Sequence, residues 1–104
     1  MIPIPDAFSA SYAEARTKFL EAAAALGLRI HSHLHRLKGR DGETLAMDGV
    51  LDGPADADKL LILSSACHGV EGYCGSGVQV AALHDAEWRE KARAQGVAVL
   101  YIHA

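Results

Sequence analysis

The sequence has few of the features that mark specialised classes of protein. It contains only two cysteines, Cys67 and Cys74, and its N-terminus has no basic segment followed by an apolar one, as an export signal would. Reduced thiols in a cytoplasmic compartment are therefore expected, rather than a disulfide framework. No apolar run approaches the roughly 20 residues that cross a bilayer. The formal net charge of -3 gives no basic excess, so neither nucleic acid nor a membrane surface is expected as a partner.

The composition is that of one small globular domain. Half of the 104 residues are hydrophobic and 22% are charged, which favours a folded chain over a disordered one. The last four residues, 101–104, continue a strand-like run with no turn or polar tail after them. We therefore expect residues 1–104 to be a fragment of a longer product.

The first half of the chain predicts a helix and a hairpin. Residues 11–14, Ser-Tyr-Ala-Glu, form a capping box, so a helix should begin at Tyr12, and Gly27 should end it. In the next segment, Leu28, Ile30 and Leu34 alternate with polar residues, which is typical of a strand with one buried face. A turn at 39–42 and a returning strand at 44–51 complete an antiparallel hairpin.

The second half predicts a parallel crossover. Residues 60–63, Leu-Leu-Ile-Leu, are a continuous apolar run of the kind found in strands covered on both faces. Helical segments at 78–83 and 85–94 follow, the second stopped by Gly96, and residues 97–102 are another buried-strand run. The fold class is therefore α/β, with a mixed sheet that contains the hairpin and a parallel crossover.

His68 and Glu71 are the candidate metal ligands. They stand three residues apart, directly after the predicted strand at 60–65, and open α/β sheets bind ligands beyond the carboxyl ends of their strands. One imidazole nitrogen and one carboxylate oxygen at this spacing can reach a single zinc ion, whose catalytic sites often combine histidines with a glutamate. The alternative is local: His68 caps the turn, and Glu71 is favoured in the first turn of a helix by its dipole.

Other glycine-rich motifs are excluded by single residues. A nucleophile elbow around Ser76 would need glycine where Cys74 stands. A phosphate loop would need lysine after Gly77, and a dinucleotide fingerprint would need glycine at Val80. The glycines at 69, 72, 75 and 77 are left to serve tight turns, either beneath a substrate or in helix packing alone.

Two further groups of residues have a chemical and a simpler interpretation. Histidines 31, 33 and 35 share one face of a predicted strand, where neighbours could bind a metal, but such a row is commonly just a solvated face. Cys67 beside His68 could act as a nucleophile, yet no third group is identifiable to orient the pair. We interpret Cys67 and Cys74 as small packed residues, and Trp88 as a helix residue covering the sheet.

The segment around His68 resembles a known family. Residues 64–79, SSACHGVEGYCGSGVQ, look like the zinc-site segment of a bacterial family of uncharacterised proteins similar to M14 zinc carboxypeptidases, typically Ser-Gly-x-His-Gly-Val-Glu-Gly-x-x-Gly-Ser. The helix at 12–27, the hairpin and the loop at 53–56 also fall where that family has them, so the resemblance covers nearly the whole chain.

The resemblance implies a fold, a cofactor and a reaction. The fold would be the three-layer α/β/α zinc-carboxypeptidase type, with zinc as cofactor and His68 and Glu71 as two of its ligands. Residues 1–104 would be the N-terminal fragment of a single metallopeptidase-like α/β domain. In such enzymes a third histidine, an arginine for the oxyanion and a glutamate base lie downstream, so the catalytic residues are expected beyond residue 104. The substrate would be a peptide or an acylated amine, and the 104-residue chain alone is expected to be inactive. The alternative is a non-catalytic structural or interaction module without metal.

Overall fold

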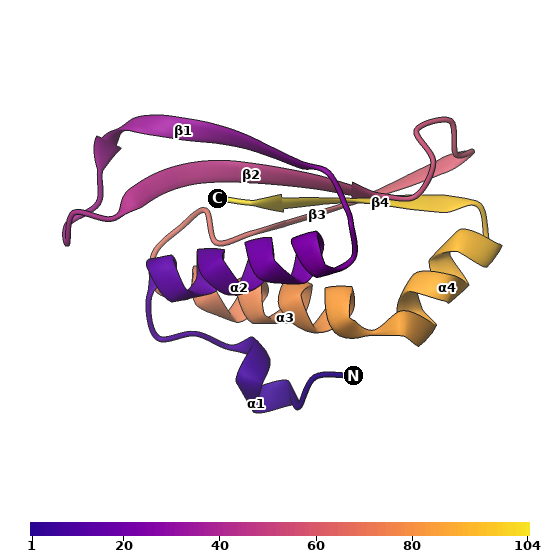
Figure 1. Cartoon of the computed structure of the whole chain (residues 1–104), viewed down its shortest axis with the longest axis horizontal. Coiled ribbons are helices and arrows are strands. Elements are labelled where there is room, and N and C mark those ends of the chain that lie inside the picture. The colour runs from indigo at the N-terminus through magenta and orange to yellow at the C-terminus, as the bar shows by residue number, and fades with distance from the viewer.

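A four-stranded mixed sheet forms the centre of the fold. The computed structural model describes residues 1–104 and orders the strands β1 (Ile30–Lys38), β2 (Thr44–Asp52), β4 (Val97–His103) and β3 (Lys59–Ser65) across the sheet (Figure 1). β2 pairs antiparallel with both β1 and β4, and β3 pairs parallel with β4. The expected α/β class, with a mixed sheet built from a hairpin and a parallel crossover, is confirmed.

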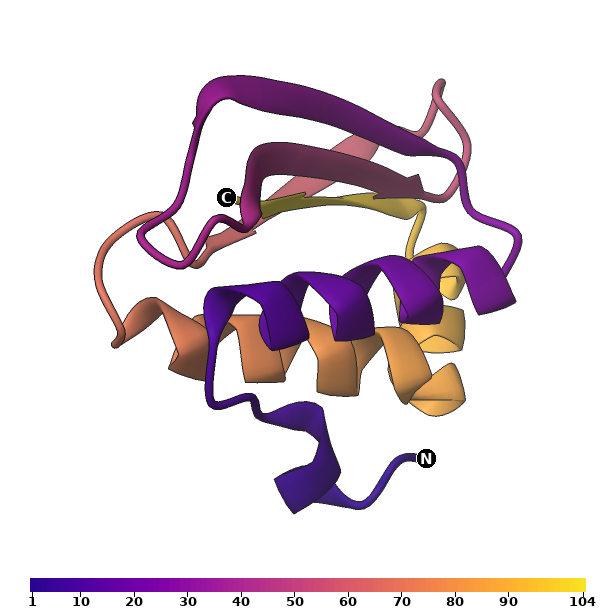
Figure 2. The ribbon, with the colours of Figure 1, turned by 60° about the vertical axis from the view of Figure 1, so that its left-hand side comes forward.

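The helices cover one face of this sheet. α2 (Tyr12–Ala25), α3 (Gly72–His84) and α4 (Ala86–Ala94) lie on the same side, and the short α1 (Ile4–Ala7), which the sequence did not predict, lies outside α3 (Figure 2). The core is the layer between sheet and helices, formed by apolar side chains from both: Phe19, Ala22, Ala23, Val50, Val80, Leu83, Val99 and Tyr101.

The ends of the helices follow the predicted signals with small differences. The Ser11 hydroxyl accepts a hydrogen bond from the Glu14 amide at 3.1 Å, as the capping box requires. The Glu14 carboxylate accepts from the Ala10 amide at 3.3 Å, one residue before the expected Ser11 amide. Gly27 and Gly96 both have positive φ, 70° and 71°, which confirms them as helix stops. α3 begins at Gly72, six residues earlier than predicted, so it contains much of the glycine-rich segment.

Two burial predictions are wrong, because the other face of the sheet is open. β3 is an edge strand with helices on one side only, so Leu60 and Ile62 are 57% and 55% exposed instead of covered on both faces. On the opposite edge Leu34 of β1 is 67% exposed, although the alternation predicted it to be buried. Residues 1–104 thus form two layers of the expected three. No helix is long and apolar enough to span a membrane.

Two buried carboxylates hold helices to the sheet. Asp52 at the end of β2 accepts hydrogen bonds from Arg89 Nε and Arg93 Nη2 of α4, each at 2.7 Å. Asp48, four residues earlier, accepts from Arg16 Nε of α2 at 2.8 Å and from the Ser32 hydroxyl at 2.6 Å. Asp48 and Asp52 lie on the helical face of β2 on either side of the buried Val50, so each charge sits among apolar neighbours and is paired there.

Candidate metal site

A tight loop joins β3 to α3 and carries the predicted motif. Ala66, the first residue after β3, has a φ of 65°, and Gly69 has a φ of 60°, so the backbone turns twice in the left-handed region. Three turn hydrogen bonds then lead into the helix, the first from the Gly72 amide to the Gly69 carbonyl at 3.2 Å. A Cβ on Gly72 would lie 2.7 Å from the Ala66 Cα, so glycine is required for the loop to close on itself.

The two predicted ligands meet on this loop. His68 Nδ1 lies 2.8 Å from Glu71 Oε1, and both side chains are exposed, 91% and 67% respectively. The hydrogen bond from His68, with one from the residue's own amide, lowers the pKa of Glu71 below its ordinary value. The carboxyl group is therefore ionised at neutral pH, which is the form that binds a metal. Glu71 makes no helix-capping hydrogen bond, so its bond to His68 is its main local contact.

The pair is a partial ligand set. Nowhere in residues 1–104 do three or more histidine, cysteine, aspartate or glutamate side chains come together as a metal-binding group. A nitrogen and an oxygen 2.8 Å apart on an exposed loop suit zinc, whose bonds to such atoms are about 2.0–2.2 Å long. The donor types and their convergence thus fit zinc, and the number of ligands is one short of the usual three.

The remaining sequence candidates do not join this pair in a metal-binding group. Cys67 on the loop and Cys74 in the first turn of α3 are both exposed free thiols, so their interpretation as packed residues is wrong. Trp88 of α4 packs at the margin of the core, as expected. His31, His33 and His35 are exposed on β1 and belong to no metal-binding group.

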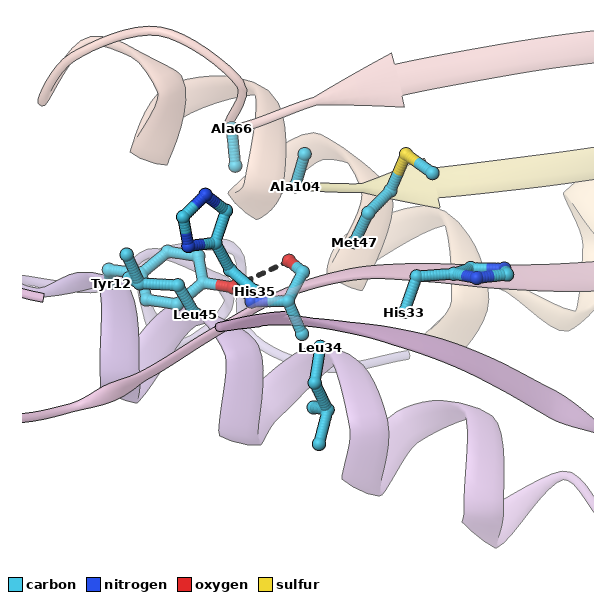
Figure 3. A pocket seen from close by; sticks show the side chains of 9 residues that line it. Tyr12, His33, Leu34, His35, Leu45, Met47, Ala66 and Ala104 are labelled. Carbon is cyan, nitrogen blue, oxygen red and sulfur yellow. Dashed lines mark hydrogen bonds between the residues drawn. The ribbon is translucent and has the colours of Figure 1, made fainter. Parts of the chain in front are cut away.

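An apolar cavity borders the motif loop. Its volume is about 400 Å³, and it is lined mainly by residues from β1, β2 and the ends of β3 and β4: Tyr12, His33, Leu34, His35, Leu45, Ala46, Met47, Ala66 and Ala104 (Figure 3). The Tyr12 hydroxyl forms one wall, where it donates to the Ala46 carbonyl at 2.8 Å. The His35 ring extends toward the side on which Ala66 lies. A second hollow shares Tyr12 and Ala66 and reaches Gly69 and Val70. The two hollows thus adjoin at Tyr12 and Ala66, and the second reaches the loop.

Sequence reasoning missed a buried polar cluster beneath the loop. Ser76 of α3 and His103 of β4 are 1% and 0% exposed, and their Oγ and Nε2 atoms lie 2.8 Å apart. One turn along α3, the Gln79 amide donates to the carbonyl oxygens of Leu63 and Ile102 at 2.8 and 3.2 Å. The available signal was Ser76 and Gln79 at helical spacing in an otherwise apolar segment. Ser76 is too deeply buried to serve as an exposed nucleophile.

The free energy of unfolding should fall in mild acid because His103 is buried. Burial lowers the pKa of His103 below its ordinary value, with Asp48 opposing this effect and Arg16 adding to it. Because the unfolded histidine takes up a proton near pH 6.5 and the buried one does not, stability should be greatest above pH 6.5 and fall as the pH drops toward the folded pKa. Urea unfolding at pH 7.5, 6.5 and 5.5 should show this loss. His103→Phe should flatten the profile over that range, and an equally steep fall in the variant would contradict the assignment.

Because Ala66 has a left-handed backbone conformation, glycine should stabilise the fold at this position and a β-branched residue should destabilise it. A non-glycine residue in this conformation costs about 1–2 kcal/mol, and glycine adds up to about 1 kcal/mol of unfolded-state entropy. Ala66→Gly should therefore raise the free energy of unfolding by about 0.5 kcal/mol, whereas a β-branched residue in Ala66→Val should lower it by about 2 kcal/mol. Ala24→Gly, at an exposed position in the last turn of α2, is the control and should cost up to about 1 kcal/mol. A loss of stability in Ala66→Gly would show that the strain is absent.

Most of the sequence matches one known family. Residues 8–104 match the family described as "Protein of unknown function (DUF2817)". The chain belongs to the DUF2817 family. A search of curated proteins finds no match. The matched range includes the motif loop, the cavity and the Ser76–His103 pair, so these features lie within the family's domain.

Solved structures resemble this DUF2817 chain in fold. A glutaminyl cyclase of Macrostomum lignano matches 91% of the chain at 8% identity with a TM-score of 0.54. A Bacteroides vulgatus protein provisionally described as a Zn-dependent exopeptidase matches 91% at 13% identity with a TM-score of 0.51. A glutaminyl cyclase of Fimbriiglobus ruber matches 96% at 12% identity, also with a TM-score of 0.51. The chain spans 31%, 38% and 41% of these proteins, and at such identities the likeness shows the fold alone.

Proposed function

We propose that this DUF2817 chain supplies the metal-binding half of a zinc-dependent hydrolase of the M14 carboxypeptidase-like type. The observation that carries the proposal is the convergence of His68 Nδ1 and Glu71 Oε1, 2.8 Å apart, on an exposed loop after a sheet strand. Support comes from the fold, which is shared with a protein provisionally described as a Zn-dependent exopeptidase. Residues 1–104 would then be the N-terminal part of a single, larger, cytoplasmic domain.

The two side chains would hold the ion in the following way. Glu71 is ionised, and its carboxylate oxygen lies within hydrogen-bond distance of His68 Nδ1. To bind zinc through these two atoms, the imidazole would carry its proton on Nε2 and leave Nδ1 unprotonated, because a metal ligand must be deprotonated. When bound, zinc polarises a scissile carbonyl and lowers the pKa of its water to about 7. Both ligands are exposed on the loop, whose neighbouring residues Gly69 and Val70 line the second hollow.

The substrate is proposed to be a peptide or an acylated amine. The cavity of about 400 Å³ beside the loop suits an apolar side chain or acyl group, because its walls are mainly hydrophobic and it falls in the size range of ligand pockets. The third zinc ligand, the general base and the oxyanion arginine would come from chain outside residues 1–104. Residues 1–104 alone are therefore expected to be inactive.

Hydrolysis by the intact gene product tests this proposal. The product should be assayed against C-terminal peptide substrates and N-acyl amino acids, with and without a zinc chelator. The expected result is hydrolysis of one class that disappears with chelation, returns with added zinc, and is absent in Glu71→Gln. Hydrolysis that resists the chelator, or full activity in Glu71→Gln, would favour a different enzyme. Inactivity together with no bound metal would favour the non-catalytic module.

A further inference from the structure

The loop that presents His68 and Glu71 is closed at its base by backbone contact. A Cβ on Gly72 would lie 2.7 Å from the Ala66 Cα, and a Cβ on Gly75 would lie 3.0 Å from the Ser65 Cβ. The end of β3 and the first turn of α3 therefore touch with no room for a side chain between them. Glycines permit such an approach without enforcing it, since they restrict the backbone least of all residues. Another group must fix how the helix sits against the strand.

His103 contacts both sides of this closure. Its Cα is the register partner of Ser65, and the next amide, that of Ala104, donates to the Ser65 carbonyl at 3.1 Å. Its side chain reaches the other side, where Nε2 lies 2.8 Å from the Ser76 hydroxyl of α3. The Phe19 ring is stacked on the imidazole with centroids 4.8 Å apart, which fixes the orientation of the ring. One residue thus connects the strand before the loop to the helix after it.

Packing alone does not account for a histidine at this position. The residue is 0% exposed, and its Nδ1 has no hydrogen-bond partner. A buried polar atom without a partner destabilises the fold, whereas two apolar side chains of similar shape would fill the same space at little cost. What an apolar pair lacks is direction, because a hydrogen bond constrains both distance and angle. The histidine therefore adds a directional contact to α3 that an apolar pair would not provide.

We infer that His103 is a positioning residue for the candidate metal site, acting through Ser76 to fix α3 against β3 and so the relative placement of His68 and Glu71. Neither His103 nor Ser76 touches the metal or the substrate. The inference rests on the proposed function, because it assigns a purpose to the geometry only if that loop binds zinc. It predicts that removing the directional bond weakens zinc binding even where the fold itself is preserved.

Zinc affinity of the intact gene product, measured by competition with a chromogenic chelator, is the primary test. Ser76→Ala, His103→Phe and the double variant should each bind zinc about tenfold more weakly, at the low end of effects seen for outer-shell partners. The double variant should regain most of the stability lost by the singles, since no polar atom of the pair is left without a partner. Ser76→Thr keeps the hydroxyl and should bind zinc like the natural protein. Co²⁺ substituted for zinc should show a shifted visible absorption band in the weakened variants.

A matched control separates positioning from general stability. Leu83→Ala truncates a buried residue of the same helix far from the loop, and should lower the melting temperature without changing zinc affinity or the Co²⁺ band. Unchanged zinc affinity in the double variant, or weakening in Leu83→Ala that matches its loss of stability, would overturn the inference while leaving the proposed function standing. A natural protein that binds no zinc would overturn the proposed function, and the inference with it.

Discussion

Replacing Asp52 with asparagine is expected to lower the free energy of unfolding by about 3 kcal/mol, since removing one partner of a buried ion pair leaves the other charge uncompensated. The Asp52 side chain is 4% exposed and Arg89 is 12% exposed, so the arginine cannot regain its lost partner from water. Burial raises the pKa of Asp52, but hydrogen bonds and charge from Arg89 and Arg93 outweigh it and leave the pKa lowered. The carboxylate is therefore charged throughout the neutral range.

Urea unfolding of the two proteins measures this loss. The control is Asp41→Asn, which breaks an ion pair with Arg40 whose side chains are 92% and 70% exposed, and should change stability by less than about 0.5 kcal/mol. Because the folded pKa of Asp52 is lowered, its contribution is complete above the unfolded value of about 3.9 and is lost as the pH falls through the folded value. The difference between natural protein and variant should therefore shrink only below about pH 4. Equal effects of the two substitutions at pH 7 would refute the claim that the buried ion pairs of Asp52 hold α4 to the sheet.

Replacing Glu71 with glutamine in the intact gene product is expected to weaken zinc binding by about 100-fold or more. Structural zinc sites with four ligands gain about 10–16 kcal/mol, so each ligand contributes enough for such a loss. Glutamine keeps the shape of the side chain and removes the charge that attracts the cation. His68→Ala should have an effect of similar size, since it removes the other donor of the pair.

Isothermal titration with zinc at pH 7.5 checks both variants. Glu87→Gln is the matched control: it makes the same chemical change at an exposed glutamate of α4, paired with Lys91 at 3.2 Å, and should leave zinc affinity unchanged. Because Glu71 is also exposed, its replacement should change the melting temperature of the metal-free protein little. A Glu71→Gln protein that binds zinc as tightly as the natural one would remove Glu71 from the site.

Local signals made most of the secondary structure predictable. Ser11, Gly27 and Gly96 bound the helices because capping and left-handed stops depend on one or two residues and little else. The same reasoning failed at Leu60–Leu63, where a continuous apolar run was taken to mean cover on both faces. Burial depends on where a strand lies in the sheet and on which layers are present, and an apolar run does not encode either.

The candidate site was likewise predictable only where it depends on local sequence. His68 and Glu71 were predictable because their spacing is local, and one turn brings them together. His103 and Ser76 were not, since 27 residues separate them and they meet only when β4 pairs with β3 and α3 packs on the sheet. The motif alone therefore identified the two candidate ligands and left out the buried pair beneath them.

Metal content of the intact gene product tests the central claim most directly. The protein should be purified without added metal and without a histidine tag, and its zinc content determined by inductively coupled plasma mass spectrometry. His68→Ala and Glu71→Gln should be prepared and measured in the same way. The account predicts close to one zinc per chain in the natural protein and little in either variant. A folded natural protein without zinc, or variants that retain it in full, would contradict the account.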